Sequence, residues 1–239
     1  MTTRLDWVGL LRHGQSTGNV AREAAEAAGR EVIDIAERDA DVPLSELGVL
    51  EARAAGEWLA GEPPQLVVAS PYLRSLDTAR IALAVAEERG VEVPGGLYVD
   101  ERLRDRELGV LDLLTSHGVA ERWPDELRRK ERHGKFYYRP PGGESWADVV
   151  LRVRSLLAEL SAETPGLRVL FVAHEMTVFA LQYVLEAVPE RDLLATAART
   201  DVPNASVTAW ERGHDGGFRM TLAQETGHLV DTPPAAPLA

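Results

Sequence analysis

Arg12 and His13 have the side-chain types needed to bind an anion and to attack it with an imidazole. They lie in the stretch VGLLRHGQSTGN, residues 8–19, where a short apolar run gives way to a polar turn punctuated by glycine. An apolar run of this length, bounded by Gly and polar residues, predicts a buried strand. Ligands in open α/β sheets bind outside the carboxyl ends of the strands. The stretch therefore indicates an anion pocket that holds an imidazole, with an ordinary strand-to-helix loop as the alternative.

The same side-chain types follow two further predicted strands. The strand-like run QLVVA precedes Arg74, and the run RVLFVA precedes His174 directly. Ser70 and Pro71 suit the cap and the first turn of a helix, which puts Arg74 early in that helix. The helix dipole opposes a cation there, and either a bound anion or a salt bridge to a carboxylate would resolve the conflict. For His174, a structural hydrogen-bonding role is the alternative.

No metal or nucleotide motif accompanies these four residues. The sequence has neither H-x-x-x-H nor a paired carboxylate–histidine spacing, and it has neither G-x-x-x-x-G-K-[ST] nor a usable G-x-G-x-x-G. It has no cysteine, which excludes disulfides, thiolate catalysis and cysteine-based zinc sites. Two arginines and two histidines thus describe a pocket for a phosphoryl group bound without a metal, and no cofactor is expected.

Six segments in order make the sequence resemble the histidine phosphatases, also called the phosphoglycerate mutase-like superfamily. They are LRHGQS with Asn19, PLS with Gly48, SP through Arg74 to TA, LRDR with Gly109, PGGES, and VAH ending at His174. Together they cover residues 8 to about 185, nearly the whole predicted domain. The resemblance implies a phosphohistidine mechanism on a small phosphorylated substrate.

In such a mechanism His13 is the nucleophile that attacks phosphorus. Imidazole attacks only when it is neutral, and its ordinary pKa of about 6.5 leaves it largely so at neutral pH. Arg12, Arg74 and His174 would bind the phosphoryl oxygens, and arginine's fixed fork suits phosphate better than lysine does. Neutral hydrogen bonds to the phosphoryl group are expected from Asn19 and from Gln15 or Ser16.

A carboxylic acid should protonate the leaving oxygen and later activate water. In the family this is the glutamate of a Glu-x-x-x-Gly motif, but four residues before Gly109 this chain has Asp105. We assign Asp105 to this role, and Glu107 is the alternative if the loop register differs. Glu175 is a second departure, since the family commonly has glycine after the second histidine. We expect the Glu175 carboxylate to face away while its backbone N–H serves the substrate.

Phosphatases and mutases of the family differ in what accepts the phosphoryl group. The family's mutases carry a long insertion that holds phosphoglycerate and excludes water. Here only about thirty residues separate Gly109 from Pro140, without a matching substrate clamp, and this favours hydrolysis. A cofactor-dependent phosphoglycerate mutase, or a catalytically weak phosphate-binding homologue, is the alternative. Candidate specificity contacts are Lys135, Tyr137 and Arg139.

Composition limits the partners and the compartment. The formal net charge of −12 argues against nucleic acid, because phosphate backbones need a basic footprint. No signal peptide or membrane-spanning run is recognisable, and the cytoplasm is the expected compartment. The expected partner is a small phosphorylated substrate or inorganic phosphate. The sequence leaves the oligomeric state open, with a homodimer as one possibility.

The elements that must position these residues indicate a three-layer α/β/α sandwich. Its central sheet is expected to be mostly parallel, with an antiparallel region from a terminal hairpin at 204–224. Residues 1–227 are predicted to form a single domain and 228–239 a disordered tail. Residues 20–28 are predicted to be helical, and no structure is assigned to residues 32–42.

Overall fold

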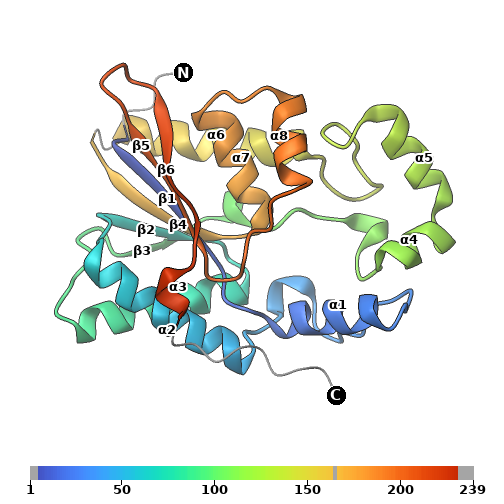
Figure 1. Ribbon diagram of the computed structural model, residues 1–239, viewed down its shortest axis with the longest axis horizontal. Coiled ribbons are helices and arrows are strands. Elements are labelled where there is room, and N and C mark those ends of the chain that lie inside the picture. The colour runs from blue at the N-terminus through green and yellow to red at the C-terminus, as the bar shows by residue number, and fades with distance from the viewer. Residues whose placement is uncertain (1–4, 164–165, 231–239) are drawn as a thin grey trace.

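The computed structural model describes residues 5–163 and 166–230. Within these residues it has a six-stranded sheet and eight α-helices (Figure 1). The strands are β1 Trp7–Arg12, β2 Leu66–Ala69, β3 Leu97–Val99, β4 Arg168–Ala173, β5 Val207–Arg212 and β6 Phe218–Glu225. The helices are α1 Thr17–Ala27, α2 Glu46–Gly61, α3 Leu73–Glu88, α4 Ser116–Arg122, α5 Pro124–His133, α6 Trp146–Glu163, α7 Glu175–Leu185 and α8 Glu190–Ala197.

The sheet order is β3-β2-β4-β1-β5-β6. Strands β3, β2, β4 and β1 run parallel, whereas β5 is antiparallel to β1 and to β6. The mostly parallel sheet and the terminal hairpin are therefore confirmed. Because β1, β2 and β4 are parallel neighbours, their carboxyl ends meet at one edge of the sheet. This edge receives Arg12 from β1 and the residues that follow Ala69 and Ala173.

Helices cover both faces of the sheet, which confirms the three-layer α/β/α arrangement. One apolar core lies between the sheet and α6 and α7, with Phe171 and Trp210 fully buried. The other lies between the sheet and α2 and α3, with Leu59 and Leu170 buried. Helices α2 and α3 lie below the sheet in Figure 1 and α6 to α8 above it, while α4 and α5 extend to the right.

Local sequence signals explain most of the helix boundaries. Ser45 caps α2 by accepting a hydrogen bond from the backbone N–H of Gly48, 3.0 Å away. Ser145 and Asp148 form the expected capping box before α6. Residues 32–42 contain a short 3₁₀ helix, η1 Asp39–Asp41. Three further 3₁₀ helices are η2 Glu101–Leu103, η3 Gly109–Leu111 and η4 Gly227–Leu229.

The structure differs from the sequence prediction at the start of α3, which begins at Leu73, so that Tyr72 is its N-cap in place of Ser70. Helix α8 was not anticipated. At the C-terminus, the described chain continues to residue 230, and Leu229 of η4 packs against the second core. The rest of the expected tail, residues 231–239, lies outside the described residues.

Candidate active site

His13 lies directly after β1, at the edge of the sheet where the parallel strands end. Its backbone N–H donates to the carbonyl oxygen of Ala173 at the end of β4. Its ring Nδ1 lies 2.8 Å from the carbonyl oxygen of Gly14. A carbonyl oxygen only accepts hydrogen bonds, so Nδ1 carries the proton and Nε2 keeps its lone pair. Burial, reinforced by His174 and the nearby arginines, lowers the pKa of His13 well below its ordinary value. The ring is therefore a neutral imidazole with a free nucleophilic nitrogen.

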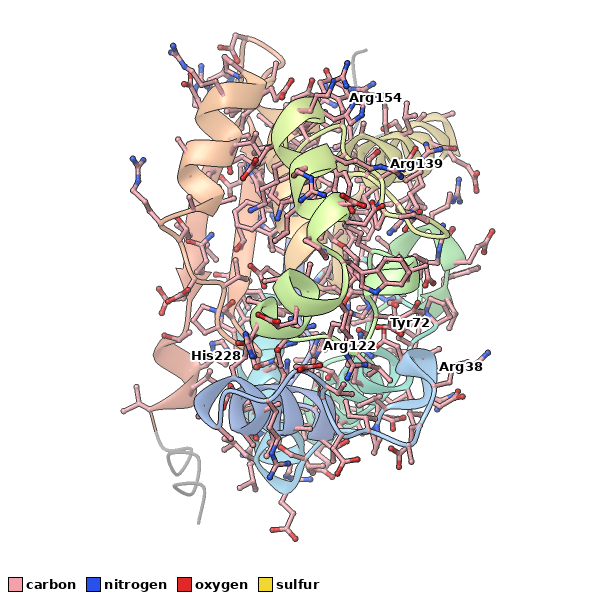
Figure 2. The ribbon with its side chains drawn as sticks, turned by 90° about the vertical axis from the view of Figure 1, so that its right-hand side faces the viewer. Arg38, Tyr72, Arg122, Arg139, Arg154 and His228 are labelled. Carbon is pink, nitrogen blue, oxygen red and sulfur yellow. The ribbon has the colours of Figure 1, made fainter. Side chains whose placement is uncertain are left out.

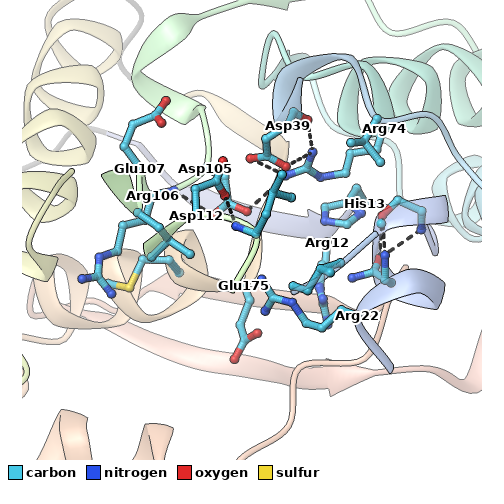
Figure 3. Close-up of a pocket in the computed structure, with 18 of the residues that line it drawn as sticks. Arg12, His13, Arg22, Asp39, Arg74, Asp105, Arg106, Glu107, Asp112 and Glu175 are labelled. Atoms are coloured by element: carbon cyan, nitrogen blue, oxygen red, sulfur yellow. Dashed lines mark hydrogen bonds and ion pairs between the residues drawn. The ribbon is translucent and has the colours of Figure 1, made fainter. Parts of the chain in front are cut away.

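A cavity of about 330 Å³ opens in front of His13. Its walls come from the β1–α1 turn, the segment 33–42, the start of α3, the loop 105–113 and the start of α7. Charged side chains converge on it in Figure 3. The cationic ones are Arg12, Arg22, Arg74, Arg106 and Lys135, and the acidic ones are Asp39, Asp105, Glu107, Asp112 and Glu175. The five cationic and five acidic side chains of the cavity therefore balance in formal charge.

Arg12 is fixed by its backbone and by one side-chain nitrogen, which leaves a donor for a ligand. Its backbone N–H donates to the Ser206 carbonyl at 3.0 Å, and its Nη1 donates to the carbonyl of Val202. The Nε–H is buried and has no hydrogen-bond partner among the described residues. Burial lowers the pKa of Arg12, yet the guanidinium stays charged. A buried unpaired donor is unfavourable, so this N–H is suited to an anion in the cavity.

Arg74 lies in the first turn of α3 and is almost fully buried, and two carboxylates occupy its guanidinium. Asp39 of η1 contacts it through the carboxylate at 3.0 Å and through its carbonyl oxygen at 2.6 Å. Asp105 contacts Nη2 at 3.2 Å. The sequence left two explanations for a cation at this helix start, an anion or a salt bridge. In this structure the ion pairs with Asp39 and Asp105 resolve the conflict.

Asp105 turns inward from the charged loop, as assigned, whereas Glu107 is exposed at the pocket wall. Burial alone would raise the pKa of Asp105, but His174, Arg74 and the backbone N–H of Arg106 together hold it below its usual value. Asp105 is therefore ionised at neutral pH. Glu107 accepts a hydrogen bond from the hydroxyl of Tyr72 at 2.8 Å. Both carboxylates thus reach the cavity, through different partners.

His174 lies behind the cavity wall, in edge contact with His13 at 5.2 Å between ring centroids. Its Nε2 is 2.8 Å from the Ser70 hydroxyl, which is why Ser70 does not cap α3. Its Nδ1 is buried, lacks a hydrogen bond among the described residues, and lies 3.4 Å from an Asp105 carboxylate oxygen. The tautomer with the proton on Nδ1 avoids opposing a lone pair to that carboxylate. Burial lowers the pKa of His174 to about 3, only partly offset by Asp105.

Asn19, Gln15 and Ser16 were expected to make neutral hydrogen bonds to the phosphoryl group, and they do not all lie at the cavity. Ser16 and Asn19 line the cavity and form a capping box at the start of α1. Gln15 is buried away from the cavity, where its side chain accepts a hydrogen bond from the Ser45 hydroxyl at 2.7 Å and its backbone N–H donates to Glu51. The structure thus brings Ser16 and Asn19, but not Gln15, to the cavity.

Of the candidate specificity contacts, Lys135 lies at the cavity and Arg139 lies outside it. Lys135 lines the cavity, with its ammonium 4.9 Å from the ring centre of Trp146. Arg139 does not line it: this exposed side chain pairs with Asp148 of the α6 capping box (Figure 2). The substrate contact expected of Arg139 is therefore not supported, because its guanidinium is committed to a helix start outside the cavity. Glu175 is exposed and lines the cavity wall, where its charge raises the pKa of Arg12 against the effect of burial.

Among the residues of this site that were not singled out in the sequence are Arg22, Asp39 and Asn204. Arg22 of α1 lines the cavity, as does Asp39, which lies in the segment to which no structure was assigned. Asn204 donates from its amide to the carbonyl oxygen of His13 at 3.0 Å and lies 3.3 Å from Asn19 Oδ1. Only Arg22 had an available signal, as a cation one helical turn beyond Asn19.

The described residues hold neither a metal-binding cluster nor a membrane-spanning helix. No three His, Asp or Glu side chains gather within residues 5–163 and 166–230 in an arrangement that could hold a metal ion. In the same part of the chain, every helix is too short or too polar to cross a membrane.

Comparison with known proteins gives the context of this geometry. The model of the histidine phosphatase superfamily (branch 1) matches residues 8–226. A 2,3-bisphosphoglycerate-dependent phosphoglycerate mutase of Rhizobium etli is 30% identical over 93% of this chain and 97% of its own. A glucosyl-3-phosphoglycerate phosphatase of Mycobacterium tuberculosis is 34% identical over 75% of each chain.

Solved structures agree with these relatives. A mycobacterial glucosyl-3-phosphoglycerate phosphatase in complex with VO3 superposes with a TM-score of 0.69 at 30% identity, over 92% of this chain and 100% of that one. The Bacillus stearothermophilus protein YhfR superposes with a TM-score of 0.71 at 25% identity, over 93% and 98% of the chains. The chain therefore belongs to the histidine phosphatase superfamily, branch 1.

Proposed function

We propose that the protein hydrolyses a small phosphomonoester through a phosphohistidine on His13, without a metal ion. The observation that carries the proposal is the tautomer of His13: Nδ1–H donates to Gly14 and leaves the Nε2 lone pair free beside the cavity. The buried, unpartnered Nε–H of Arg12 supports it, because it offers a donor to a phosphoryl oxygen. Relatives of the chain include enzymes named as phosphatases and as mutases.

In the first half-reaction Nε2 of His13 attacks phosphorus, and the bond between phosphorus and the ester oxygen breaks. His174 lies behind the cavity wall, where its Nδ1 faces Asp105 at 3.4 Å, and the phosphoryl oxygens are held by Arg12 and Arg74. Preorganised donors of this kind each contribute about 3–4 kcal/mol to transition-state stabilisation. The leaving oxygen takes a proton and departs as the alcohol.

We assign the proton transfer to Asp105, with Glu107 as the alternative. Arg74 and His174 face Asp105 and keep it ionised. A phosphoryl dianion bound to Arg74 would offset that cation and raise the pKa of Asp105 in the complex. In the second half-reaction the carboxylate accepts a proton from water, which attacks phosphorus and breaks its bond to Nε2. Phosphate and free His13 are the products.

Hydrolysis is favoured over mutase activity by the charge balance of the cavity. Its five cationic side chains face five carboxylates, and two of those carboxylates already pair with Arg74. A mutase of this mechanism must hold a bisphosphorylated intermediate of high negative charge while excluding water. A site balanced in charge suits a smaller anion. Lys135 and Arg106, at the wall away from His13, are the proposed contacts of the leaving group.

The deciding experiment measures phosphate release from an aryl phosphate in the presence of EDTA, by wild type and by His13→Ala. A parallel reaction offers 3-phosphoglycerate with and without 2,3-bisphosphoglycerate. EDTA-resistant release that His13→Ala abolishes, without isomerisation, is the expected result. Isomerisation that outpaces hydrolysis would replace the phosphatase by a mutase. Phosphate binding without either activity would make the protein a binding homologue.

A further inference from the structure

Among the described residues, the carboxylate of Asp39 is paired with one cation, Arg74. Its carboxylate oxygens lie 3.0 Å and 3.5 Å from the two terminal nitrogens of Arg74. Among the described residues, no other group donates to this carboxylate. Asp105 is held differently, because it also accepts the backbone N–H of Arg106 at 2.8 Å and faces His174. Figure 3 shows Asp39 and Asp105 on the same side of Arg74.

A phosphoryl group on Arg74 would therefore change the surroundings of Asp39 more than those of Asp105. Besides Arg74, the charged or titratable groups facing Asp39 are Asp105, Asp112 and Tyr72, none of them a cation. Once an anion shares the guanidinium, Asp39 is left beside negative charges and a neutral phenol. Nearby negative charges disfavour the ionised form of a carboxylate and so raise its pKa.

We propose that Asp39 takes up a proton when a tetrahedral dianion binds to Arg74, so that binding of the dianion is coupled to protonation of this carboxylate. This inference rests on the proposed function, since it concerns the same phosphoryl-binding cations. Asp39 tends this way even without the anion: partial burial raises its pKa, the charge of Asp105 raises it further, and Arg74 only partly compensates. The protonated carboxyl can donate its O–H to an oxygen of the bound anion. Asp39 is thus a specificity residue that links anion affinity to pH.

The neighbouring Asp41 is a matched control in the same 3₁₀ helix. It pairs with Arg38 at 2.9 Å, both side chains are more than half exposed, and it does not line the cavity. Figure 2 shows Arg38 pointing outward from the molecule. Asp39→Asn and Asp41→Asn therefore remove the same charge from the same element, one inside the site and one outside it.

Tungstate is a suitable probe, because it stays a tetrahedral dianion across the neutral range and any proton taken up belongs to the protein. Calorimetric titration in two buffers of different ionisation enthalpy gives the number of protons bound per tungstate. We expect Asp39→Asn to take up about one proton fewer per tungstate than wild type and Asp41→Asn, whatever Asp105 contributes to the uptake of all three proteins. Asp39→Asn should also bind about tenfold more tightly at pH 7.5, and this advantage should vanish as acid protonates Asp39 in wild type.

The pH dependence of wild-type affinity tests the inference without a variant, since coupled uptake weakens tungstate binding as the pH rises. Equal proton uptake by wild type and Asp39→Asn overturns the inference, as does uptake that Asp105→Asn alone removes. Hydrolysis of an aryl phosphate with tungstate binding that is independent of pH would overturn the role of Asp39 and leave the proposed function standing. Absence of both hydrolysis and tungstate binding would overturn both.

Discussion

The side-chain amide of Asn204 donates a hydrogen bond to the main-chain carbonyl oxygen of His13 at 3.0 Å. The backbone N–H of Ala205 donates to the same oxygen at 3.2 Å. The loop between α8 and β5 also supplies the Val202 and Ser206 carbonyls that hold Arg12. A loop from the end of the domain therefore fixes the backbone of the proposed nucleophile and its neighbouring arginine.

Asn204→Ala should lower kcat more than it raises KM, because it frees the turn that carries His13 without removing a group that contacts substrate. The His13 carbonyl oxygen keeps the Ala205 N–H, so the lost hydrogen bond costs about 0.5–1.5 kcal/mol, divided here between folding and catalysis. Steady-state kinetics and thermal unfolding measure the two parts. Ser206→Ala is the control, since its hydroxyl bonds only to Pro203 in the same loop. A loss of stability with unchanged kcat would reduce Asn204 to a purely structural residue.

Asp105→Asn and Glu107→Gln should separate the two candidates for proton transfer. A general acid–base group contributes about 10²–10⁴-fold, so we expect kcat for an alkyl phosphate to fall by that range in Asp105→Asn. In Glu107→Gln, which keeps a hydrogen-bond acceptor for Tyr72, we expect a change of less than tenfold. An activated aryl phosphate, whose leaving oxygen needs no proton, should be affected less. The reverse ranking would assign the role to Glu107.

Stability should fall as the pH drops below about 6.5, because His174 is buried in its neutral form. Its pKa is lowered to about 3 in the folded protein, so the unfolded chain binds the proton first. Between these pH values this one residue removes up to roughly 1.4 kcal/mol of unfolding free energy per pH unit. Urea unfolding at several pH values measures the slope. The His174→Asn variant should show a shallower slope, and an identical slope would contradict the assignment.

Gly48→Ala should destabilise the protein by about 1–3 kcal/mol, because α2 packs directly against the turn that follows His13. A Cβ at this position would lie 1.9 Å from the carbonyl oxygen of Gln15, a backbone atom that cannot move away alone. Gly61→Ala, at the other end of the same helix, meets nothing within 4 Å and should be neutral or slightly stabilising. Thermal unfolding compares the two, and equal melting temperatures would show that the turn relaxes.

The sequence predicted those parts of the site that follow buried strands. Arg12, Arg74 and His174 each come shortly after an apolar run, and parallel pairing of those runs is enough to bring them together. It predicted the inward turn of Asp105 from a motif, although alternating charges usually mark a solvated face. The hydrogen bond between Ser70 and His174 was missed because a Ser-Pro pair has the same sequence signature as a helix cap.

The contributions of irregular segments could not be predicted in this way. Asp39 reaches Arg74 from a charged connector without hydrophobic periodicity, and only tertiary packing brings the two together. Arg139 shows the opposite error, since an arginine in an aromatic loop has the composition of a site wall yet pairs with a capping aspartate. Local sequence cannot distinguish these two cases. A long charged side chain can reach several partners, and the folded structure determines which one it contacts.

The position of β1 between β4 and β5 determines how much of the chain must be made before the site can form. This strand is made first, but its two partners, β4 and β5, end at residues 173 and 212. During synthesis, β1 therefore lacks its first strand partner until residue 173 has been made and its second until residue 212. Pairing over such sequence separation is also slow to form. Catalytic activity should consequently report completion of the whole domain, and fragments that end before β5 should be inert.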